Sequence, residues 1–593
     1  MSQLYQRFKW FIKLYRRQYF VAFIFVVLNY IIALLPPLMV GRIADGLTER
    51  SMDRADFVRM IVALALTVVL LYFVDYMWNI RLLKGGDMIS RVTRHRLMER
   101  FRRQGPTFYA EHSTGSLMGK STNDVLALAD MAGYGVMALC DAALNPLVII
   151  LMMGIRISWP MTLLAVLPLP LIMVLSLYIG RKVYPLYDVA QEAFDEMNDA
   201  VLDNVAGVRV VRAYGREDSQ VVTFQEKSED LYRKNMAVVR YRIWFPIISK
   251  LIPGFSYAIA LALSARGIYN GTLSIGQMIS FIIYVDMIVW PMFALGDFIN
   301  VGQMGLASME RIQELLDRPF DVDDAPGALE FTGPANIECR ACSFTYPGSS
   351  EPGLRDVSFV LKEGETLGLV GKIGSGKTTL LRQFLRFYPA QEDGQIYLGG
   401  RPIQEYKIKS LRARIGYCPQ RAVLFSRSIR DNILMGADLD GPDAVTDRPD
   451  LEDRLSQVLD LADLRKDLSQ FPEGLDTLAG EKGIALSGGQ KQRICIARAL
   501  FKDPDILILD DALSAVDTET EAEILERLRV DREGKTTLIS SHRLSCVMAA
   551  DHIVVLKNGR VRHQGTHEQL LTSDRWYKKQ FVHQQMEDRQ SAG

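Results

Sequence analysis

Long runs of apolar residues dominate the first 320 positions of the chain. A helix that crosses a membrane needs about 20 predominantly apolar residues, and several runs approach or exceed that length. A single run could equally be a buried helix of a soluble protein, but this many would need a great deal of covering structure. The pattern therefore predicts six membrane spans. They lie at residues 19–40, 57–80, 135–155, 160–180, 244–266 and 275–297.

Lysine and arginine cluster beside some of these spans and not beside others. Segments rich in these residues tend to stay on the cytoplasmic side of a membrane. Basic residues precede the first span, follow the second and follow the fourth, which predicts that both termini are cytoplasmic. The polar segments 79–134 and 181–243 have helical patterning, so the neighbouring spans are expected to continue as helices into the cytoplasm.

The character of the chain changes at about residue 325. Apolar stretches shorten to strand length, turn residues separate them, and no further run is long enough to span a membrane. We therefore predict two domains, a membrane domain at residues 1–320 and a cytoplasmic α/β domain at residues 325–585.

Composition sharpens this division and excludes one class of partner. The 593 residues carry 69 Lys and Arg against 69 Asp and Glu, and zero net charge argues against a nucleic-acid-binding protein. The mean hydropathy of +0.07 averages an apolar half with a polar half. The six cysteines are irregularly spaced, which predicts reduced thiols without a disulfide framework. Cys339 and Cys342 lie in a strand-like stretch, where positions three apart face opposite sides, so no zinc site is expected.

A glycine-rich motif follows a predicted strand and opens a predicted helix. Residues Gly371–Thr378 fit the pattern G-x-x-x-x-G-K-[ST] in that context. Glycines let backbone N–H groups approach phosphate oxygens, and the dipole at a helix N-terminus attracts negative charge. Lys377 would then reach the β- and γ-phosphates of a nucleotide, and the Thr378 hydroxyl would bind Mg²⁺. The motif predicts a nucleotide-binding domain of the P-loop type.

Two further motifs lie in the same domain. Residues 506–509 form a short apolar run typical of a buried parallel strand, and Asp510 at its end is placed to hold Mg²⁺. The stretch LSGGQKQR at residues 486–493 has a serine and two glycines at a predicted helix start. A helix N-terminus with an added hydroxyl group favours the binding of an anion.

The spacing of these motifs resembles the nucleotide-binding domain of an ATP-binding cassette (ABC) transporter, a family whose signature is LSGGQ. The six preceding spans resemble the type IV exporter architecture, in which the membrane domain is fused N-terminal to the cassette. This resemblance covers nearly the whole chain. It implies an α-helical transmembrane bundle followed by an α/β P-loop domain, in a bacterial inner or plasma membrane, with ATP and Mg²⁺ as cofactors.

The resemblance also implies roles for individual residues. Tyr346 matches the aromatic residue that stacks on adenine, although by itself it could be an ordinary strand aromatic. Gln420 matches the glutamine that senses Mg²⁺ and the γ-phosphate, and His542 matches the histidine that contacts the γ-phosphate. Mg²⁺ would be held by Thr378, Asp510 and Gln420. The other nucleotide contacts would come from Gly371, Gly374, Ser375, Gly376, Lys377 and Thr379, and from Ser487, Gly488, Gly489 and Gln490.

In this family two cassettes pair head to tail, so each ATP lies between the phosphate loop of one cassette and the signature of the other. A chain with one cassette is then half of a transporter and must dimerise. The resemblance places Ser514–Asp517 at the crossing between cassettes, and Glu481 at the contact with the helical extensions. It also places residues 115–124 and 213–219 against the cassettes, although these segments alone would indicate only solvated helix tips.

Directly after Asp510 this family usually has a glutamate that polarises the attacking water, and here the residue is Asp511. One methylene less withdraws the carboxylate by on the order of 1 Å, and such misplacement costs roughly a hundredfold in rate. Either a small backbone shift restores the reach of Asp511, or this site binds ATP and hydrolyses it slowly. The second interpretation resembles the MdlA-like half of heterodimeric multidrug exporters, whose partner carries the glutamate. The candidate catalytic residues are Asp511, Gln420 and His542.

Ionisable residues inside the spans are candidates for substrate contact, because exposing them to lipid is costly. Acidic residues lining a cavity would favour cationic amphiphiles, with aromatic and methionine side chains beside them. The equally weighted alternative is that the acidic residues pair with other helices and fix their packing. The ionisable positions are Asp75, Asp141, Asp286, Lys250 and Arg266, and the apolar contacts are Tyr284, Met287, Trp290 and Met292.

The sequence therefore predicts an ABC transporter ATPase that exports amphipathic drugs, cationic ones among them, or lipids by alternating access. Its expected partners are a second half-transporter that carries glutamate, the membrane, and hydrophobic or cationic small molecules or lipids, but no nucleic acid. The alternative is a homodimeric lipid flippase or peptide exporter, which would normally carry glutamate at position 511. A non-transport ABC ATPase conflicts with the six spans, and importers usually keep membrane domain and cassette on separate chains.

Overall fold

Two structural units divide the chain in the computed structural model. The first, which we call the helical unit, comprises Met1–Arg102 and Thr114–Arg318. The second, the α/β unit, comprises Arg103–Ser113 and Pro319–Gly593. The structure describes residues 2–390, 395–437, 451–480 and 486–591.

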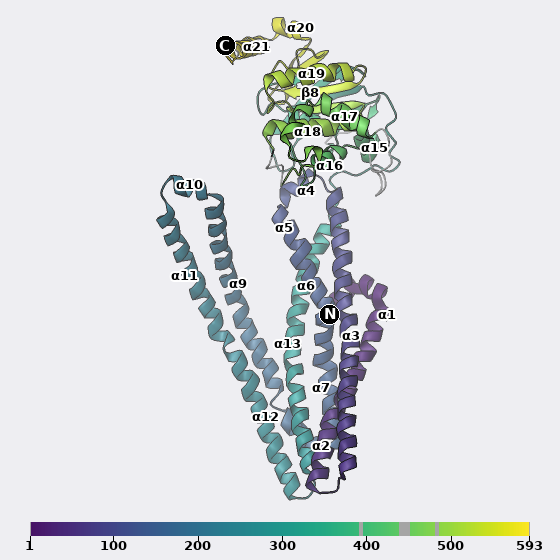
Figure 1. The fold of residues 1–593 in the computed structure, drawn as a ribbon, viewed down its shortest axis with the longest axis vertical. Helices are drawn as coiled ribbons and strands as arrows, with labels where there is room; N and C mark the ends of the chain where they lie inside the picture. Colours follow the sequence, from purple (N-terminus) through teal and green to yellow (C-terminus); the bar gives the residue numbers. More distant parts are fainter. Residues whose placement is uncertain (1, 391–394, 438–450, 481–485, 592–593) are drawn as a thin grey trace. The chain divides into compact units, whose positions relative to one another are not determined.

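Long helices joined by short connections make up the helical unit (Figure 1). Within the described residues, six helical stretches are long and apolar enough to cross a membrane, which agrees with the predicted number of spans. Helix α3 has 50 residues, about 75 Å at 1.5 Å per residue, so it continues past a hydrocarbon core about 30 Å thick, as predicted. The helices are α1 (Ser2–Ala33), α2 (Leu35–Thr48), α3 (Arg54–Arg103), α5 (Thr114–Gly119), α6 (Val125–Asp130), α7 (Val136–Arg156), α8 (Trp159–Val166), α9 (Pro170–Ala206), α10 (Val208–Ala213), α11 (Glu217–Arg242), α12 (Trp244–Tyr269) and α13 (Ile275–Asp317), with π-helical turns η1 (Lys120–Asp124) and η2 (Met131–Gly135).

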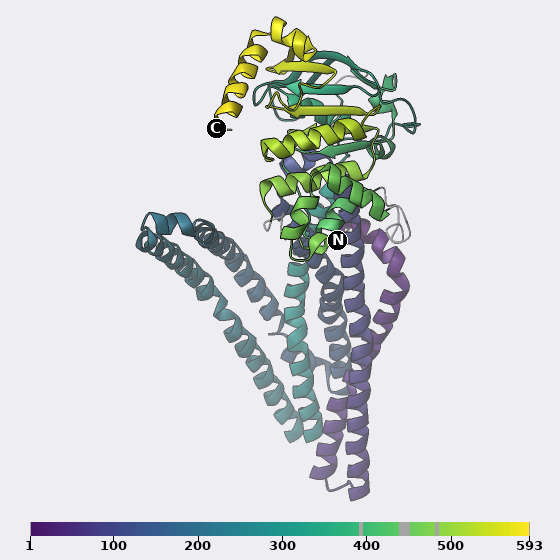
Figure 2. The same ribbon diagram turned by 45° about the horizontal axis from the view of Figure 1, so that its top comes forward.

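Helices α9 and α11 pack side by side as a long pair joined by α10 (Figures 1 and 2). The polar segment 181–243 is therefore helical over most of its length, as its pattern predicted. The segment 213–219 contains the turn between α10 and α11, where Gly215 has a φ of +59°. Its contact with a cassette stays a prediction.

Helix α13 is the central helix of the helical unit and packs against α2, α7, α9 and α12. Its residues Phe281, Tyr284, Val285 and Ile288 are fully buried. A helix that is apolar on most of its surface must be covered by other helices or by lipid, and here neighbouring helices cover this part of it. The packing of α13 therefore positions the neighbouring spans of the same chain.

The first residues of α13 lie very close to α2. A Cβ atom added to Gly276 would lie 1.9 Å from the carbonyl oxygen of Gly41. Asp45 of α2 caps the start of α13, because its carboxylate accepts hydrogen bonds from the Gly276 N–H at 2.6 Å and from the Ser274 hydroxyl at 2.7 Å. Acidic groups at a helix N-terminus are favourable because they meet unpaired N–H groups. The two glycines allow this approach, and the carboxylate stabilises it.

Two β-sheets form the framework of the α/β unit. The six-stranded sheet has the order β10-β9-β3-β8-β7-β6, in which only β10 is antiparallel to its neighbour. The four-stranded sheet has the order β2-β1-β4-β5 and is antiparallel throughout. Strands β7 and β8 are buried at every residue, as central parallel strands require. The strands are β1 (Ile337–Thr345), β2 (Pro352–Leu361), β3 (Thr366–Val370), β4 (Ile396–Leu398), β5 (Arg401–Pro402), β6 (Ile415–Cys418), β7 (Ile506–Asp510), β8 (Thr536–Ser541), β9 (His552–Lys557) and β10 (Arg560–Gly565).

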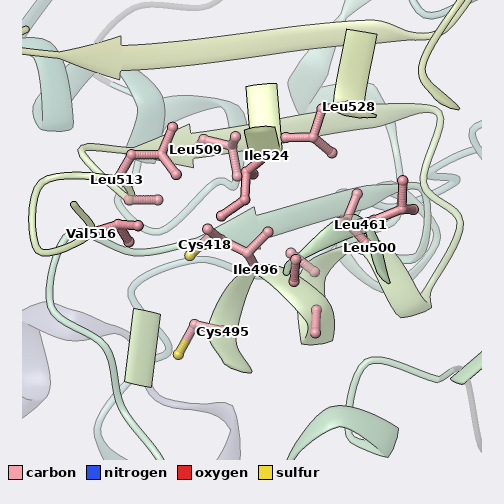
Figure 3. Packing of buried hydrophobic residues seen from close by; sticks show 14 of the residues in the cluster. Cys418, Leu461, Cys495, Ile496, Leu500, Leu509, Leu513, Val516, Ile524 and Leu528 are labelled. Carbon is pink, nitrogen blue, oxygen red and sulfur yellow. The ribbon is translucent and has the colours of Figure 1, made fainter. Parts of the chain in front are cut away.

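Helices bury the apolar side chains of the six-stranded sheet. In Figure 3, Cys418 of β6 and Leu509 of β7 belong to one cluster with Ile496 of α18 and Ile524 of α19. This packing places the carboxyl ends of the parallel strands and the nearby loops, and it confirms the predicted α/β fold class. The helices are α4 (Pro106–Glu111), α14 (Lys377–Phe384), α15 (Ile408–Ala413), α16 (Ile429–Leu434), α17 (Leu451–Leu461), α18 (Gly488–Phe501), α19 (Thr518–Asp531), α20 (His567–Ser573) and α21 (Arg575–Ser591).

The prediction that Cys339 and Cys342 face opposite sides of a strand is wrong. Both side chains are only 2% exposed, and both belong to the same buried cluster. The pairing of β1 with β2 shifts register between them, and Ala341 adopts a φ of +50°. An irregularity of this kind adds a residue to one strand and reverses the alternation beyond it. The simple two-residue period therefore fails at this point.

Helix α4 belongs to the α/β unit although it lies in the first cytoplasmic segment of the sequence. The segment grouped with the α/β unit is Arg103–Ser113, whereas residues 115–124 belong to the helical unit. Phe108 of α4 is fully buried, and its backbone N–H donates to Asp321 at 3.3 Å. The contact predicted between residues 115–124 and a cassette stays a prediction.

We expect Gly276→Ala to destabilise the helical unit by about 1–3 kcal/mol, because the added methyl group would overlap the backbone of α2. Thermal unfolding of the full chain in detergent measures this effect. The matched control is Gly296→Ala on the same helix, where an added Cβ meets nothing within 4 Å. Equal melting temperatures for the two variants would contradict the close α2–α13 contact.

Candidate nucleotide-binding site

The loop Gly371–Thr378, called the phosphate loop below, connects the carboxyl end of β3 with α14. Gly374 and Gly376 have φ values of +78° and +103°, which residues with a side chain rarely adopt. At Gly371 an added Cβ would lie 2.3 Å from the carbonyl oxygen of Leu556. The three glycines of the motif are thus required by the backbone path of the loop itself.

Lys377, the first residue of α14, lies across this loop. Its Nζ donates to the carbonyl of Gly371 at 2.8 Å and to that of Lys372 at 3.3 Å. Burial lowers the pKa of Lys377, whereas the nearby carboxylates of Asp510 and Asp511 act in the opposite direction. A polyphosphate would supply further negative charge to this partly desolvated ammonium group.

Asp510 ends the buried strand β7 and is only 1% exposed. Its Oδ1 accepts hydrogen bonds from the hydroxyls of Thr378 at 2.9 Å and Ser540 at 2.8 Å. Burial raises the pKa of Asp510. The carboxylate and hydroxyl oxygens of Asp510 and Thr378 are the donors that Mg²⁺ prefers. Among the described residues, no group of three or more His, Cys, Asp or Glu is arranged to hold a metal ion.

The three candidate catalytic residues come from separate segments and meet at Asp511, which contacts both Gln420 and His542. One carboxylate oxygen accepts a hydrogen bond from Gln420 Nε2 at 3.2 Å, and the other lies 3.0 Å from His542 Nδ1. The backbone N–H of Asp511 donates to the carbonyl of Ser540 at 3.0 Å. These contacts draw the loops after β6, β7 and β8 towards one carboxylate.

Tyr346 lies beside the same helix start, in the loop after β1. Its hydroxyl donates to the hydroxyl of Thr379 at 3.0 Å, and its ring makes edge contacts with Phe344 and Tyr388 at centroid distances of 5.0 and 5.2 Å. The ring is therefore held in place near the phosphate loop. Its stacking on adenine stays a prediction.

The signature segment forms a capped helix start. Ser487 is the N-cap of α18, and it exchanges hydrogen bonds with Gln490 in a capping box. An added Cβ at Gly489 would lie 3.0 Å from the carbonyl oxygen of Ala515, so this glycine allows the helix to lie against the loop after β7. Within the described residues, no hydrogen bond joins the signature to the phosphate loop of the same chain.

Two residues of this site were missed at the sequence level. Ser540 donates to Asp510 and its carbonyl accepts from Asp511, so it positions both carboxylates. Gln492 is 4% exposed and donates to the carbonyl of Gln420 at 2.7 Å, which ties that residue to α18. The available signals were a hydroxyl residue near the end of the strand before His542, and a glutamine two positions after the signature.

The other segments expected at the cassette contacts are only partly described. Ser514 donates to the carbonyl of Asp511 at 2.9 Å, and Asp517 caps α19 by accepting from the Thr520 N–H at 2.9 Å. The loop at Ser514–Asp517 is thus ordered by contacts inside its own unit. Glu481 lies outside the described residues.

Two of the acidic residues in the spans accept hydrogen bonds from tyrosines on other helices. Tyr30 of α1 donates to the buried Asp141 of α7 at 2.6 Å. Tyr257 of α12 donates to Asp286 of α13. The expectation that Tyr284 contacts a substrate is wrong, because its ring is fully buried and its hydroxyl donates to the carbonyl of Leu34 at 2.7 Å.

A glycine-rich phosphate loop and an acidic strand end define a nucleotide-hydrolysing domain. The six candidate spans form a membrane domain in the same chain, so the protein is of the transporter ATPase class. Two family models match the chain: that of the ABC transporter transmembrane region over residues 19–292, and that of the ABC transporter over residues 354–514.

The chain is also similar to known proteins over nearly its whole length. It is 40% identical to the probable multidrug resistance ABC transporter ATP-binding/permease protein YheI of Bacillus subtilis (strain 168), covering 99% of this chain and 98% of that protein. It is 34% identical to the multidrug resistance-like ATP-binding protein MdlA of Escherichia coli (strain K12), covering 99% and 97%. The structure of a bacterial Atm1-family ABC exporter with ATP bound matches with a TM-score of 0.77 at 25% identity, covering 96% and 98%.

The chain belongs to the ABC transporter family, as an exporter with an N-terminal membrane domain and a C-terminal cassette. It is an ATPase of the multi-pass membrane type, with its cassette on the cytoplasmic side. The predicted family and architecture are therefore confirmed.

We expect Asp510→Asn to raise the melting temperature of the nucleotide-free protein at pH 7 and to weaken Mg²⁺-dependent ATP binding. The folded-state pKa of Asp510 is raised by burial, so folding favours its protonated form, and stability falls as pH rises through that pKa. The amide removes this cost, and the gain should shrink in acid, where Asp510 is neutral. Thermal unfolding at pH 7 and at successively lower pH measures the difference, with the exposed Glu519→Gln as control. A lower melting temperature for Asp510→Asn at pH 7 would contradict the assignment.

Proposed function

We propose that this chain is one half of a heterodimeric drug exporter, and that the ATP site on its own phosphate loop binds ATP but hydrolyses it slowly. The observation that carries this proposal is the position of Asp511, whose two carboxylate oxygens contact Gln420 and His542. A general base must lie within about 2.6–3.2 Å of the group whose proton it takes. The short side chain of Asp511 is instead engaged by other protein groups.

The backbone at position 511 opposes a compensating shift. Asp511 has a φ of +50°, and its N–H is bonded to the carbonyl of Ser540 at 3.0 Å. A non-glycine residue keeps such a conformation only where the surrounding structure holds it. Moving the carboxylate forward by on the order of 1 Å would disturb this bond, and a displacement of that size is worth roughly a hundredfold in rate.

The other site residues would keep their binding roles in this proposal. The phosphate loop and Lys377 bind the phosphates of ATP, and Tyr346 stacks on the adenine. Thr378 and Asp510, with Gln420, hold Mg²⁺, which when bound neutralises charge between the phosphates. The remaining contacts are Gly371, Gly374, Ser375, Gly376 and Thr379, and His542 at the γ-phosphate.

The intact signature at Ser487–Gln490 supports a role in a second site. It would complete the ATP site on the phosphate loop of a partner that carries glutamate after its Asp. ATP binding would close the two cassettes and turn the substrate cavity outward, and hydrolysis in the partner's site would reset it. In this arrangement residues 1–320 form the membrane domain and residues 325–585 form the cassette.

Asp286 supports a cationic amphiphile as the class of substrate. It lies halfway along the span 275–297 and is exposed in the single chain. A carboxylate at that depth is costly against lipid, so this face of α13 must turn to a polar cavity or to the second subunit. Trp290, one turn later, is 56% exposed and offers an aromatic face to a cation.

We expect the isolated chain to hydrolyse ATP slowly and Asp511→Glu to raise the rate by roughly a hundredfold, because the longer side chain reaches the attacking water. ATPase activity of the purified chain at saturating ATP and Mg²⁺ measures this. The control is Asp511→Asn, which should remain slow while ATP binding is retained. Rapid hydrolysis by the unmodified isolated chain would contradict the heterodimer and would favour the homodimeric lipid flippase or peptide exporter.

Replacing Asp286 with Asn should reduce efflux of a cationic dye on the order of tenfold, and leave efflux of a neutral amphiphile unchanged. Transport into inverted vesicles that contain both halves of the exporter gives this comparison. Tyr257→Phe is the matched control, since it deletes the hydrogen bond to Asp286 and keeps the negative charge. If both variants lower the transport of all substrates equally, Asp286 fixes helix packing and does not recognise charge.

A further inference from the structure

A cavity of about 230 Å³ lies beside the phosphate loop. It is lined by Lys372 and Ser375 of that loop, by Lys557 and Arg562 of β9 and β10, and by Trp576 of α21. In the sheet β3 lies between β8 and β9, so this cavity is on the β9 side of the phosphate loop, whereas Asp510 and Asp511 follow β7 on the other side. The cavity is therefore distinct from the side of the loop where the candidate catalytic residues meet.

The charged side chains that line this cavity are basic. They are Lys372, Lys557 and Arg562, and none of the described residues lining it is acidic. Arg562 is paired with Asp574 behind the wall, whereas the two lysines form no side-chain ion pair with any residue that the structure describes. A pocket with two unneutralised cations favours a multiply charged anion.

One wall of the cavity is positioned in advance by a buried carboxylate. Asp574 is only 1% exposed and pairs with Arg562 at 3.1 Å. The same carboxylate accepts hydrogen bonds from the backbone N–H groups of Trp576 at 2.7 Å and Tyr577 at 3.2 Å. The Arg562 guanidinium group and the backbone at Trp576 are thus attached to one fixed point, which limits the entropy that a ligand would have to overcome on this wall.

The phosphate loop presents an unpaired polar group to the same cavity. Ser375 is 4% exposed, and its hydroxyl has no hydrogen-bond partner among the described residues. Leaving a buried hydroxyl unpaired costs about 1–3 kcal/mol. An anion held by the neighbouring cations would give this hydroxyl an acceptor.

We propose that this cavity is a second anion site of the cassette, which takes a small phosphate-bearing molecule other than the transported substrate. Its volume is below the ~300–1,000 Å³ of pockets for drug-sized ligands, so the ligand is of the size of pyrophosphate and not of a nucleotide. Because Lys372 and Ser375 belong to the phosphate loop, binding here is linked to ATP binding, and each ligand changes the affinity of the other by the same factor.

The chain carries a built-in reporter for this site. Its six tryptophans include only one after residue 290, and that residue is Trp576 in the wall of the cavity. Inorganic pyrophosphate, titrated into the full-length protein at constant ionic strength without Mg²⁺, should change the tryptophan fluorescence in a saturable way. The Trp576→Phe variant should not show this change. The Lys377→Ala variant should keep this saturable signal, because Lys377 serves the ATP side of the loop.

Lys557→Gln should weaken pyrophosphate binding on the order of tenfold, since it removes one charge-assisted contact. Lys578→Gln, an exposed lysine on α21 that does not line the cavity, is the matched control. Both positions are on the surface, and equal melting temperatures will show that each variant is folded. Loss of the signal in Lys377→Ala would place pyrophosphate in the ATP site and overturn the proposal. The absence of any saturable signal from Trp576 would also overturn it. So would equal pyrophosphate binding by Lys557→Gln and Lys578→Gln.

Discussion

Two adjacent carboxylates at the end of β7 organise the nucleotide-binding face of the α/β unit. Asp510 turns inward to the hydroxyls of Thr378 and Ser540, whereas Asp511 turns to Gln420 and His542. Two like charges on neighbouring residues are tolerated only when separate partners satisfy each of them. The phosphate loop and the segments after β6 and β8 are placed by those partners.

The same arrangement connects the nucleotide site to the signature helix. Gln492 of α18 holds the backbone of Gln420, and Gly489 lets the start of α18 approach the loop after Asp511. A change at the carboxylates can therefore reach α18 through direct contacts. In the helical unit, α13 has the comparable central position, because it packs against four other long helices and starts in the cap formed by Asp45.

Several features of the fold could be read from the sequence because their signals are local. The six spans follow from length and apolar composition, and the phosphate loop follows from glycines at fixed spacing before Lys377. The α/β class follows from short apolar runs separated by turns. The prediction for Cys339 and Cys342 failed because a register shift between strands depends on the partner strand, which lies elsewhere in the chain. Tyr284 was misplaced for a similar reason, since only the packing of α13 decides which of its faces is enclosed.

The sequence alone determined the family, the two kinds of domain and the identity of the residue after Asp510. Each of these depends on residue type and spacing, which are properties of a single segment. Only the tertiary structure decided that Asp511 contacts Gln420 and His542, that Ser540 and Gln492 belong to the site, and that basic side chains from β9, β10 and the phosphate loop share a cavity with Trp576. These contacts join residues from about 30 to 200 positions apart. The sheet order and helix packing bring them together, and both result from the burial of apolar side chains over the whole unit. A short sequence pattern contains no information about burial on that scale.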